Sequence, residues 1–108
     1  MQSVRSKKLR PSHPGEYLRE DVLPELGISQ TEFAERLGVS RRTVSELVHE
    51  RRPVTPDMAI RLSRLIDSTP EFWLRLQQMV DLWELERSNA NKYAGIKRLS
   101  SVSKRKAG

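Results

Sequence analysis

The hydrophobic positions of residues 29–52 recur with the spacing of two short helices joined by a tight turn. The first helix is predicted to begin after Ser29 and to end at Gly38, and the second to begin at Arg41. The apolar residues that these helices would direct inward are Phe33, Ala34, Leu37, Val44, Leu47 and Val48. The pattern therefore predicts a pair of helices that pack on one core.

Polar residues at the helix ends favour the same boundaries. Ser29 followed by Glu32 forms a capping box, in which each side chain accepts a hydrogen bond from a free backbone N–H. Gly38 stands where the chain must leave the first helix through a positive φ, which a residue without Cβ adopts readily. Ser40 is the predicted N-cap of the second helix.

The outward face of the second helix is polar and basic. At about 100° per residue, the residues that share one arc of roughly 140° are Arg41, Arg42, Ser45, Glu46 and His49. Two arginines at the start of an exposed helix suit the major groove of DNA, where guanine O6 and N7 accept bonds from a guanidinium. This face predicts DNA binding, and a plain αα-hairpin is the alternative that shares the spacing.

A further helix is predicted before this pair. Pro14 suits the first helical position, and His13 before it is interpreted as a cap or a surface residue. Pro24 and Gly27 are predicted to end this helix. Its inward positions are Tyr17, Leu18 and Val22, and the residues predicted to anchor the following loop to the core are Leu26 and Ile28.

Two more helices are predicted after the pair, each opened by a threonine cap and a first-position proline, at Thr55-Pro56 and Thr69-Pro70. The first of them carries an apolar stripe made of Met58, Leu62, Leu65 and Ile66. Five helices with short connections predict an all-α domain.

The last and longest helix has two apolar faces. The residues predicted to face the core, within about 120°, are Phe72, Leu76, Met79, Val80 and Trp83, with Trp73 at the border. Those on a separate arc of about 80° are Leu74, Leu82 and Leu85. A helix with two apolar faces is typical of one that contacts its own domain and a second copy, so we predict a homodimer interface there. A different partner protein and isolated surface leucines are the alternatives.

Basic charge is concentrated at the two ends of the chain. Residues 1–11 and 87–108 carry eleven Lys and Arg side chains and no acidic one, whereas residues 12–86 carry a net charge of −5. This composition predicts a disordered basic arm over 1–11, a domain over 12–87 and a basic, disordered tail over 88–108. In the tail, Ile96, Leu99 and Val102 recur every three residues, so a short helix on a partner is an alternative. The basic arm and the basic tail could contact DNA phosphates, or they could serve solubility alone.

Several function classes are not expected. The chain has no cysteine, no apolar run long enough for a signal sequence or a membrane span, no glycine-rich phosphate loop and no cluster with metal-ligand spacing. We therefore expect a cytoplasmic protein that is not an enzyme and has no catalytic residues, metal site, cofactor or small-molecule substrate.

The segment of residues 29–52 resembles the helix-turn-helix of the Xre, or lambda-repressor-like, family. The residues at the motif positions are Gln30, Ala34, Gly38, Val44 and Leu47. Residues 13–83, and most specifically TPEFWLRLQ, resemble HigA-type antitoxins within that family. The resemblance implies an all-α homodimer that binds double-stranded operator DNA. It also implies a HigB-like, mRNA-cleaving toxin as partner and repression of the shared operon.

The resemblance also implies roles for individual residues. The implied base contacts are Arg41, Arg42, Ser45 and Glu46. The implied phosphate contacts are Gln30, Ser40, Thr43, Arg51 and Arg52. Glu46 departs from the residues common at its position: it could accept a bond from cytosine N4, or it could fold back onto an arginine. His49 could reach a phosphate or remain at the edge of this face.

The hypothesis is therefore an autoregulating repressor of the HigA antitoxin kind. Two alternatives stay open at this point. One is an Xre-type regulator without a toxin, and the other is a toxin-binding module whose helix-turn-helix is vestigial.

Overall fold

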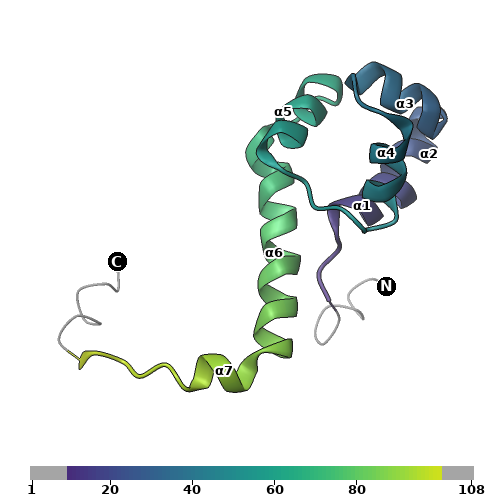
Figure 1. Cartoon of the computed structure of the whole chain (residues 1–108). Helices are drawn as coiled ribbons and strands as arrows, with labels where there is room; N and C mark the ends of the chain where they lie inside the picture. Colours follow the sequence, from purple (N-terminus) through teal and green to yellow (C-terminus); the bar gives the residue numbers. More distant parts are fainter. Residues whose placement is uncertain (1–9, 101–108) are drawn as a thin grey trace.

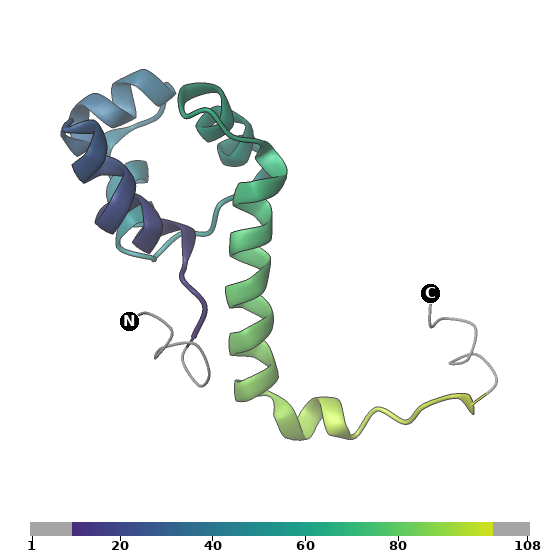
Figure 2. The ribbon, with the colours of Figure 1, turned by 180° about the vertical axis from the view of Figure 1, so that it is seen from behind.

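The computed structural model describes residues 10–100, whose regular structure is entirely helical (Figure 1). The elements are α1 (Pro14–Tyr17), η2 (Leu18–Val22), α2 (Leu23–Leu26), α3 (Gln30–Leu37), α4 (Arg41–Val48), α5 (Pro56–Leu65), α6 (Pro70–Ser88) and α7 (Ala90–Ala94). Within these residues the prediction of an all-α fold is confirmed. The helices before α6 form a compact head, and α6 extends away from it toward α7 (Figures 1 and 2).

The first three elements follow one another without a break, so the prediction that Pro24 ends the first helix was wrong. The continuous helix runs through Pro24 and ends at Gly27, whose φ is +68°, so the prediction is confirmed for Gly27. The turn before Pro24 is a π-helix, in which the N–H of Leu23 bonds to the carbonyl of Leu18, five residues back. A proline in a regular α-helix clashes with the carbonyl one turn earlier, and the wider π turn relieves that clash.

The anchoring of the following loop was predicted only in part. Ile28 packs against the core as expected. Leu26 was expected to do the same, but its side chain is 47% exposed. Because the first helix continues past Pro24, Leu26 lies on the outer side of its last turn rather than in a loop that folds inward.

The turn between α3 and α4 forms as its capping residues predicted. Ser29 Oγ accepts from the N–H of Glu32 at 3.1 Å, and Ser40 Oγ accepts from the N–H of Thr43 at 3.0 Å. Gly38 has a φ of +77°. The carboxylate of Glu32 is used differently from the predicted capping box, because it binds the guanidinium of Arg36 at 2.8 Å. The hydroxyl half of the box is therefore present and the carboxylate bonds one turn along the helix instead.

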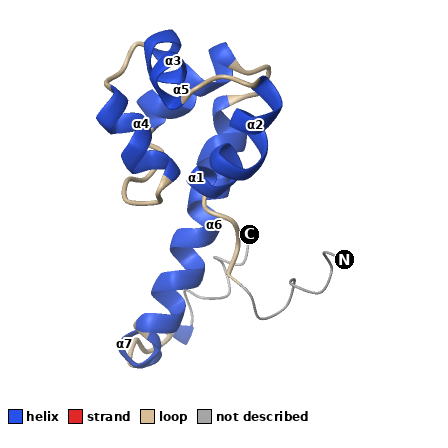
Figure 3. Cartoon of the chain, turned by 90° about the vertical axis from the view of Figure 1, so that its right-hand side faces the viewer, coloured by secondary structure: helices blue, strands red, loops and turns tan. Residues whose placement is uncertain are grey.

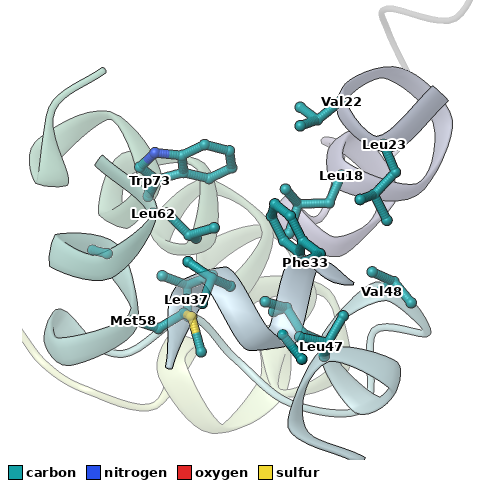
Figure 4. Close-up of a cluster of buried hydrophobic side chains, with 14 residues drawn as sticks. Leu18, Val22, Leu23, Phe33, Leu37, Leu47, Val48, Met58, Leu62 and Trp73 are labelled. Carbon is teal, nitrogen blue, oxygen red and sulfur yellow. The ribbon is translucent and has the colours of Figure 1, made fainter. Parts of the chain in front are cut away.

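The core lies between the helices of the head (Figure 4). The largest buried side chains include Trp73, Phe33, Leu18, Leu47 and Leu62. One close approach defines how the first helix sits on α4: a Cβ added to Gly15 would lie 1.9 Å from the carbonyl oxygen of Leu47. Only glycine permits this contact, which fixes the distance between α1 and α4.

The face of α6 that meets the core agrees with the predicted one only in part. Its buried residues are Trp73, Gln77 and Val80, whereas Met79, predicted to face the core, is 49% exposed. Trp73, predicted at the border, is fully buried and packs against the rings of Tyr17 and Phe72. Val80 is buried, and Phe72 and Leu76 pack against the core, as predicted, so the core-facing side is the predicted one extended toward Trp73 and Gln77. A polar residue, Gln77, occupies the centre of the stripe, and a hydrophobic pattern cannot predict that.

The second apolar face of α6 is also smaller than predicted. Leu74 packs partly against the core, so it is shared between the domain and the outer surface. Leu82 and Leu85 are 52% and 47% exposed, as an unpartnered face requires. The distal half of α6 stands clear of the head, with α7 turning away at its foot (Figure 3). Among the described helices, none is long and apolar enough to cross a membrane.

The ends of the described chain carry more structure than their composition predicted. The short helix α7 lies inside the stretch 88–108 that was expected to be disordered. At the other end, Arg10 belongs to the predicted arm, yet it donates to Glu50 at 3.1 Å and to Glu84 at 2.8 Å. Residues 1–9 and 101–108, including Val102, lie outside the described residues, and the domain limits at 12 and 87 stay predictions.

Candidate nucleic-acid interface

Helix α4 presents its basic face outward because its apolar residues are fully used by the core. Val44, Leu47 and Val48 are buried completely. On the opposite side, Arg41 and Arg42 are exposed, and the side chain of Arg42 is 85% exposed. Ser45 and Glu46 are half-buried on the same helix. The arrangement matches the one that the sequence predicted for a helix that enters a groove of DNA.

Glu46 is the centre of a charge cluster on this face. Its Oε2 accepts from Nε of Arg42 at 3.0 Å. Its Oε1 accepts from Nη2 and Nε of Arg52 at 2.7 and 3.1 Å. The bonds from Arg52 and then from Arg42 hold the pKa of Glu46 below its ordinary value of 4.5. Of the two roles that the sequence left open, the structure shows the carboxylate folded back onto arginines.

Ser40 and Thr43, both predicted to contact phosphate, bond to each other at the start of α4. Besides the cap bond, the two hydroxyl oxygens lie 2.9 Å apart. Ser40 is exposed and Thr43 is half-buried. The pair therefore fixes the first turn of α4, with the Ser40 side chain on the surface beside Arg41.

The remaining predicted contacts flank this helix. Gln30 is the first residue of α3 and is half-exposed. Arg51 and Arg52 are exposed in the segment after α4. His49, at the end of α4, is exposed and its Nδ1 lies 2.8 Å from the carbonyl oxygen of Ser45. The structure thus brings Arg42, Glu46 and Arg52 into direct contact and leaves the other predicted residues around them.

Two arginines that the sequence did not single out hold α4 in place. The guanidinium of Arg19 donates to the carbonyl oxygen of Val48, in the last turn of α4. Arg61 donates to the carbonyl oxygen of Leu37 at 2.9 Å and to that of Gly38 at 3.4 Å, so it ties α5 to the turn before α4. Both act on helix ends, where carbonyls lack partners within the helix. Their donors come from distant segments, so no local pattern reveals them.

The segment that carries Arg51 and Arg52 is held at both ends. Before it, Glu50 has a φ of +63° and pairs with Arg10 and with Arg19. Burial opposes the ionisation of Glu50, but the hydrogen bond and charge of Arg10 outweigh it, so the pKa of Glu50 lies below its ordinary value. After it, the N–H of Val54 donates to Oε1 of the buried Gln77 at 2.9 Å. These contacts restrict where the two arginines can reach.

The chemistry of this surface is that of anion and base recognition. Exposed arginines offer planar donor forks to phosphates and to guanine edges, and the adjacent hydroxyls offer further polar contacts. Among residues 10–100 there is no group of His, Asp or Glu side chains that could hold a metal ion.

Comparison with known proteins gives the following matches. Residues 17–74 match the family HTH_3, described as helix-turn-helix. The chain is 40% identical over 79 residues to an uncharacterized HTH-type transcriptional regulator of Haemophilus influenzae, which covers 73% of this chain and 74% of that protein. It is 42% identical over 81 residues to antitoxin HigA-1 of Vibrio cholerae, which covers 75% of this chain and 76% of that protein.

A solved structure is similar over nearly its whole length. It is that of the Pseudomonas aeruginosa antitoxin HigA with the higBA promoter, with a TM-score of 0.79 and 41% sequence identity. The similarity covers 83% of this chain and 99% of that one. The resemblance to HigA-type antitoxins found in the sequence is thereby confirmed.

Proposed function

Because this chain belongs to the helix-turn-helix family, we propose that it is a sequence-specific repressor of the HigA antitoxin kind, which binds the operator of its own operon. The observation that carries the proposal is the outward face of α4, where exposed Arg41 and Arg42 stand on a helix whose other side is fully buried. The solved relative, the antitoxin HigA with the higBA promoter, supports DNA as the ligand.

Within this proposal the residues divide into two groups. Arg41, Arg42 and Ser45 face the bases in the major groove, with the guanidinium forks on guanine O6 and N7. The groups that position the protein on the phosphates are Gln30, Ser40, Thr43, Arg51 and Arg52. Glu46 lies between the two groups on the same face and acts on the arginines that it binds.

The repressor works as a homodimer through the distal half of α6. Leu82 and Leu85 are exposed and line a groove with Leu74, Val54 and Gln77. A helix that projects from its domain with such a groove suits a symmetric contact with the same helix of a second copy. Two copies then place two α4 helices on the two halves of an inverted repeat.

The same resemblance supplies the second partner, a HigB-like toxin that cleaves mRNA. The support is the 42% identity with antitoxin HigA-1. A stand-alone regulator remains the second candidate, favoured by the relative from Haemophilus influenzae, which is described as a transcriptional regulator. Co-expression with the product of the neighbouring gene separates the two: an antitoxin relieves that product's toxicity and co-purifies with it.

Replacement of Arg41 and Arg42 by alanine tests the DNA-binding role. We expect the double variant to lose its preference for its own upstream DNA over random DNA in a gel-shift titration, while circular dichroism shows unchanged helicity. Each bidentate contact that is lost should cost about 1–3 kcal/mol per half-site. The reason is that no other side chain on α4 offers the same donor fork.

The matched control replaces Arg36 and Arg64, two exposed arginines of α3 and α5. It removes the same charge away from α4 and should leave the preference for operator DNA in place. A specific shift that survives in the Arg41→Ala/Arg42→Ala variant would refute the assignment. Weak binding that depends little on salt in the unmodified protein would favour a toxin-binding module with a vestigial helix-turn-helix.

A further inference from the structure

The carboxylate of Glu46 stands in the middle of the basic face and binds two of its arginines at once. Arg42, one turn earlier on α4, gives it one bond, from Nε at 3.0 Å. Arg52, six residues later, gives Oε1 two bonds, at 2.7 and 3.1 Å. The carboxylate thus bridges the helix to the segment that follows it.

The two arginines are held to different degrees. Arg42 is bound through one nitrogen and its side chain is 85% exposed, so the outer edge of its guanidinium remains open. Arg52 is bound through two nitrogens, and its side chain is 43% exposed. Glu46 therefore orients Arg42 and engages two of the five N–H donors of Arg52.

From this geometry we propose that Glu46 is a specificity-determining residue, which lowers the affinity of the protein for non-operator DNA by occupying Arg42 and Arg52. The inference rests on the proposed function, since it concerns how that same surface distinguishes one DNA from another. It differs from a base contact, because the carboxylate acts on the protein's own arginines rather than on cytosine.

The physical reason is the difference between the two kinds of DNA contact. Non-specific binding comes from phosphate neutralisation by free cations, and each such contact steepens the salt dependence. An arginine that is already paired gains less from a phosphate than a free one does, and the carboxylate itself repels the phosphate backbone. A guanine edge, in contrast, offers two acceptors in the plane of the guanidinium and can complete the coordination of Arg42.

The test is the Glu46→Gln variant of the full chain, titrated with random-sequence duplex and with the protein's own upstream DNA at several salt concentrations. Glutamine keeps the shape of the side chain but loses the charge that holds both arginines. We expect affinity for random DNA to rise about ten-fold and the slope of log K against log salt to steepen by about 1–2. Affinity for operator DNA should change less than about three-fold, so the ratio of operator affinity to random-DNA affinity falls.

The control is Asp57→Asn, on α5. It removes the same charge and also breaks an ion pair with an arginine, the 2.8 Å contact from Arg61. We expect it to leave the ratio of operator to random affinity unchanged. The rise in random-DNA affinity is then specific to the carboxylate on α4 and does not come from net charge alone.

Each outcome separates the inference from the proposed function. If the unmodified protein shows no preference for its upstream DNA, the proposed function fails. If it shows that preference and Glu46→Gln raises both affinities equally, or neither, the inference alone is overturned. Loss of operator binding in Glu46→Gln would also overturn it, because Glu46 would then read a base directly.

Discussion

His13 is buried and caps the first helix, and this combination makes its charge state important. Its Nδ1 accepts from the N–H of Gly15 at 2.8 Å, and the side chain is 6% exposed. A ring nitrogen can accept this bond only when it carries no proton. Burial lowers the pKa of His13 below its ordinary value of 6.5, against the charge of Glu50, which raises it. Of its two predicted roles, the cap is the one observed.

The stability of the fold should therefore fall as pH drops from 7 to 5. The folded state binds the proton of His13 more weakly than the unfolded chain, so the loss begins as pH falls through the ordinary value of 6.5. This loss of stability is complete once the pH is below the pKa that His13 has in the folded state. The paired carboxylates of Glu46 and Glu50 have lowered pKa values, and their contribution is lost only below about 4.5.

The variant His13→Asn isolates this effect, because asparagine is a good N-cap that does not titrate. Chemical denaturation at pH 7, 6 and 5 should give a free energy of unfolding that declines in the unmodified protein and stays nearly level in the variant. Equal declines in the two proteins would show that another group controls stability in this pH range.

At the scale of elements, the amide side chain of Gln77 joins α6 to the segment that connects α4 and α5. Oε1 of Gln77 accepts from the N–H of Val54, and its Nε2 donates to Asp81 at 2.9 Å. Val54 is itself buried. A buried backbone N–H needs an acceptor, so the amide explains why a polar residue, Gln77, faces the core.

Replacement of Gln77 by leucine should destabilise the protein by about 1–3 kcal/mol, because the N–H of Val54 is left buried without an acceptor. The measurement is urea unfolding monitored by circular dichroism. Gln78→Leu is the matched control, since this neighbour is exposed on the same helix and should have a small effect. If leucine at position 77 were as stable as glutamine, the orientation of α6 would have to be set by apolar packing alone.

At the scale of the whole molecule, the projecting half of α6 is where a second copy is proposed to dock. Leu85 lies between Glu84 and Glu86 in the sequence, and Asp81 precedes Leu82, so acidic side chains stand beside the apolar contact. Symmetric docking would bury the two leucines of both copies and leave the charges at the rim, as in other protein interfaces. The two DNA-binding faces are then joined through α6.

The double variant Leu82→Glu/Leu85→Glu should convert the dimer into a monomer in sedimentation velocity. Burial of each leucine contributes about 1.5–3 kcal/mol, so the dimer dissociation constant should rise more than about a hundred-fold. The control is Leu26→Glu/Ile60→Glu, two leucine-sized residues of the head that are each 47% exposed. Loss of the dimer in the control as well, or its persistence in the α6 variant, would place the interface elsewhere.

The sequence by itself determined the features that depend on near neighbours. Ser29, Ser40, Thr55 and Thr69 cap the helices that were predicted to follow them, because a cap bonds to a backbone N–H only three residues away. The outward face of α4 followed from helical spacing alone. The family followed from residues within the same short segments.

The tertiary structure decided what depends on residues far apart in the chain. The bonds of Arg19 to Val48, of Arg61 to Leu37 and of Gln77 to Val54 join segments 29, 24 and 23 residues apart. Glu46 makes contacts of both kinds. Its bond to Arg42 joins residues one helical turn apart, whereas its bonds to Arg52 depend on the path of the chain after α4. Local periodicity contains no information about such paths, since packing and buried hydrogen bonds choose them.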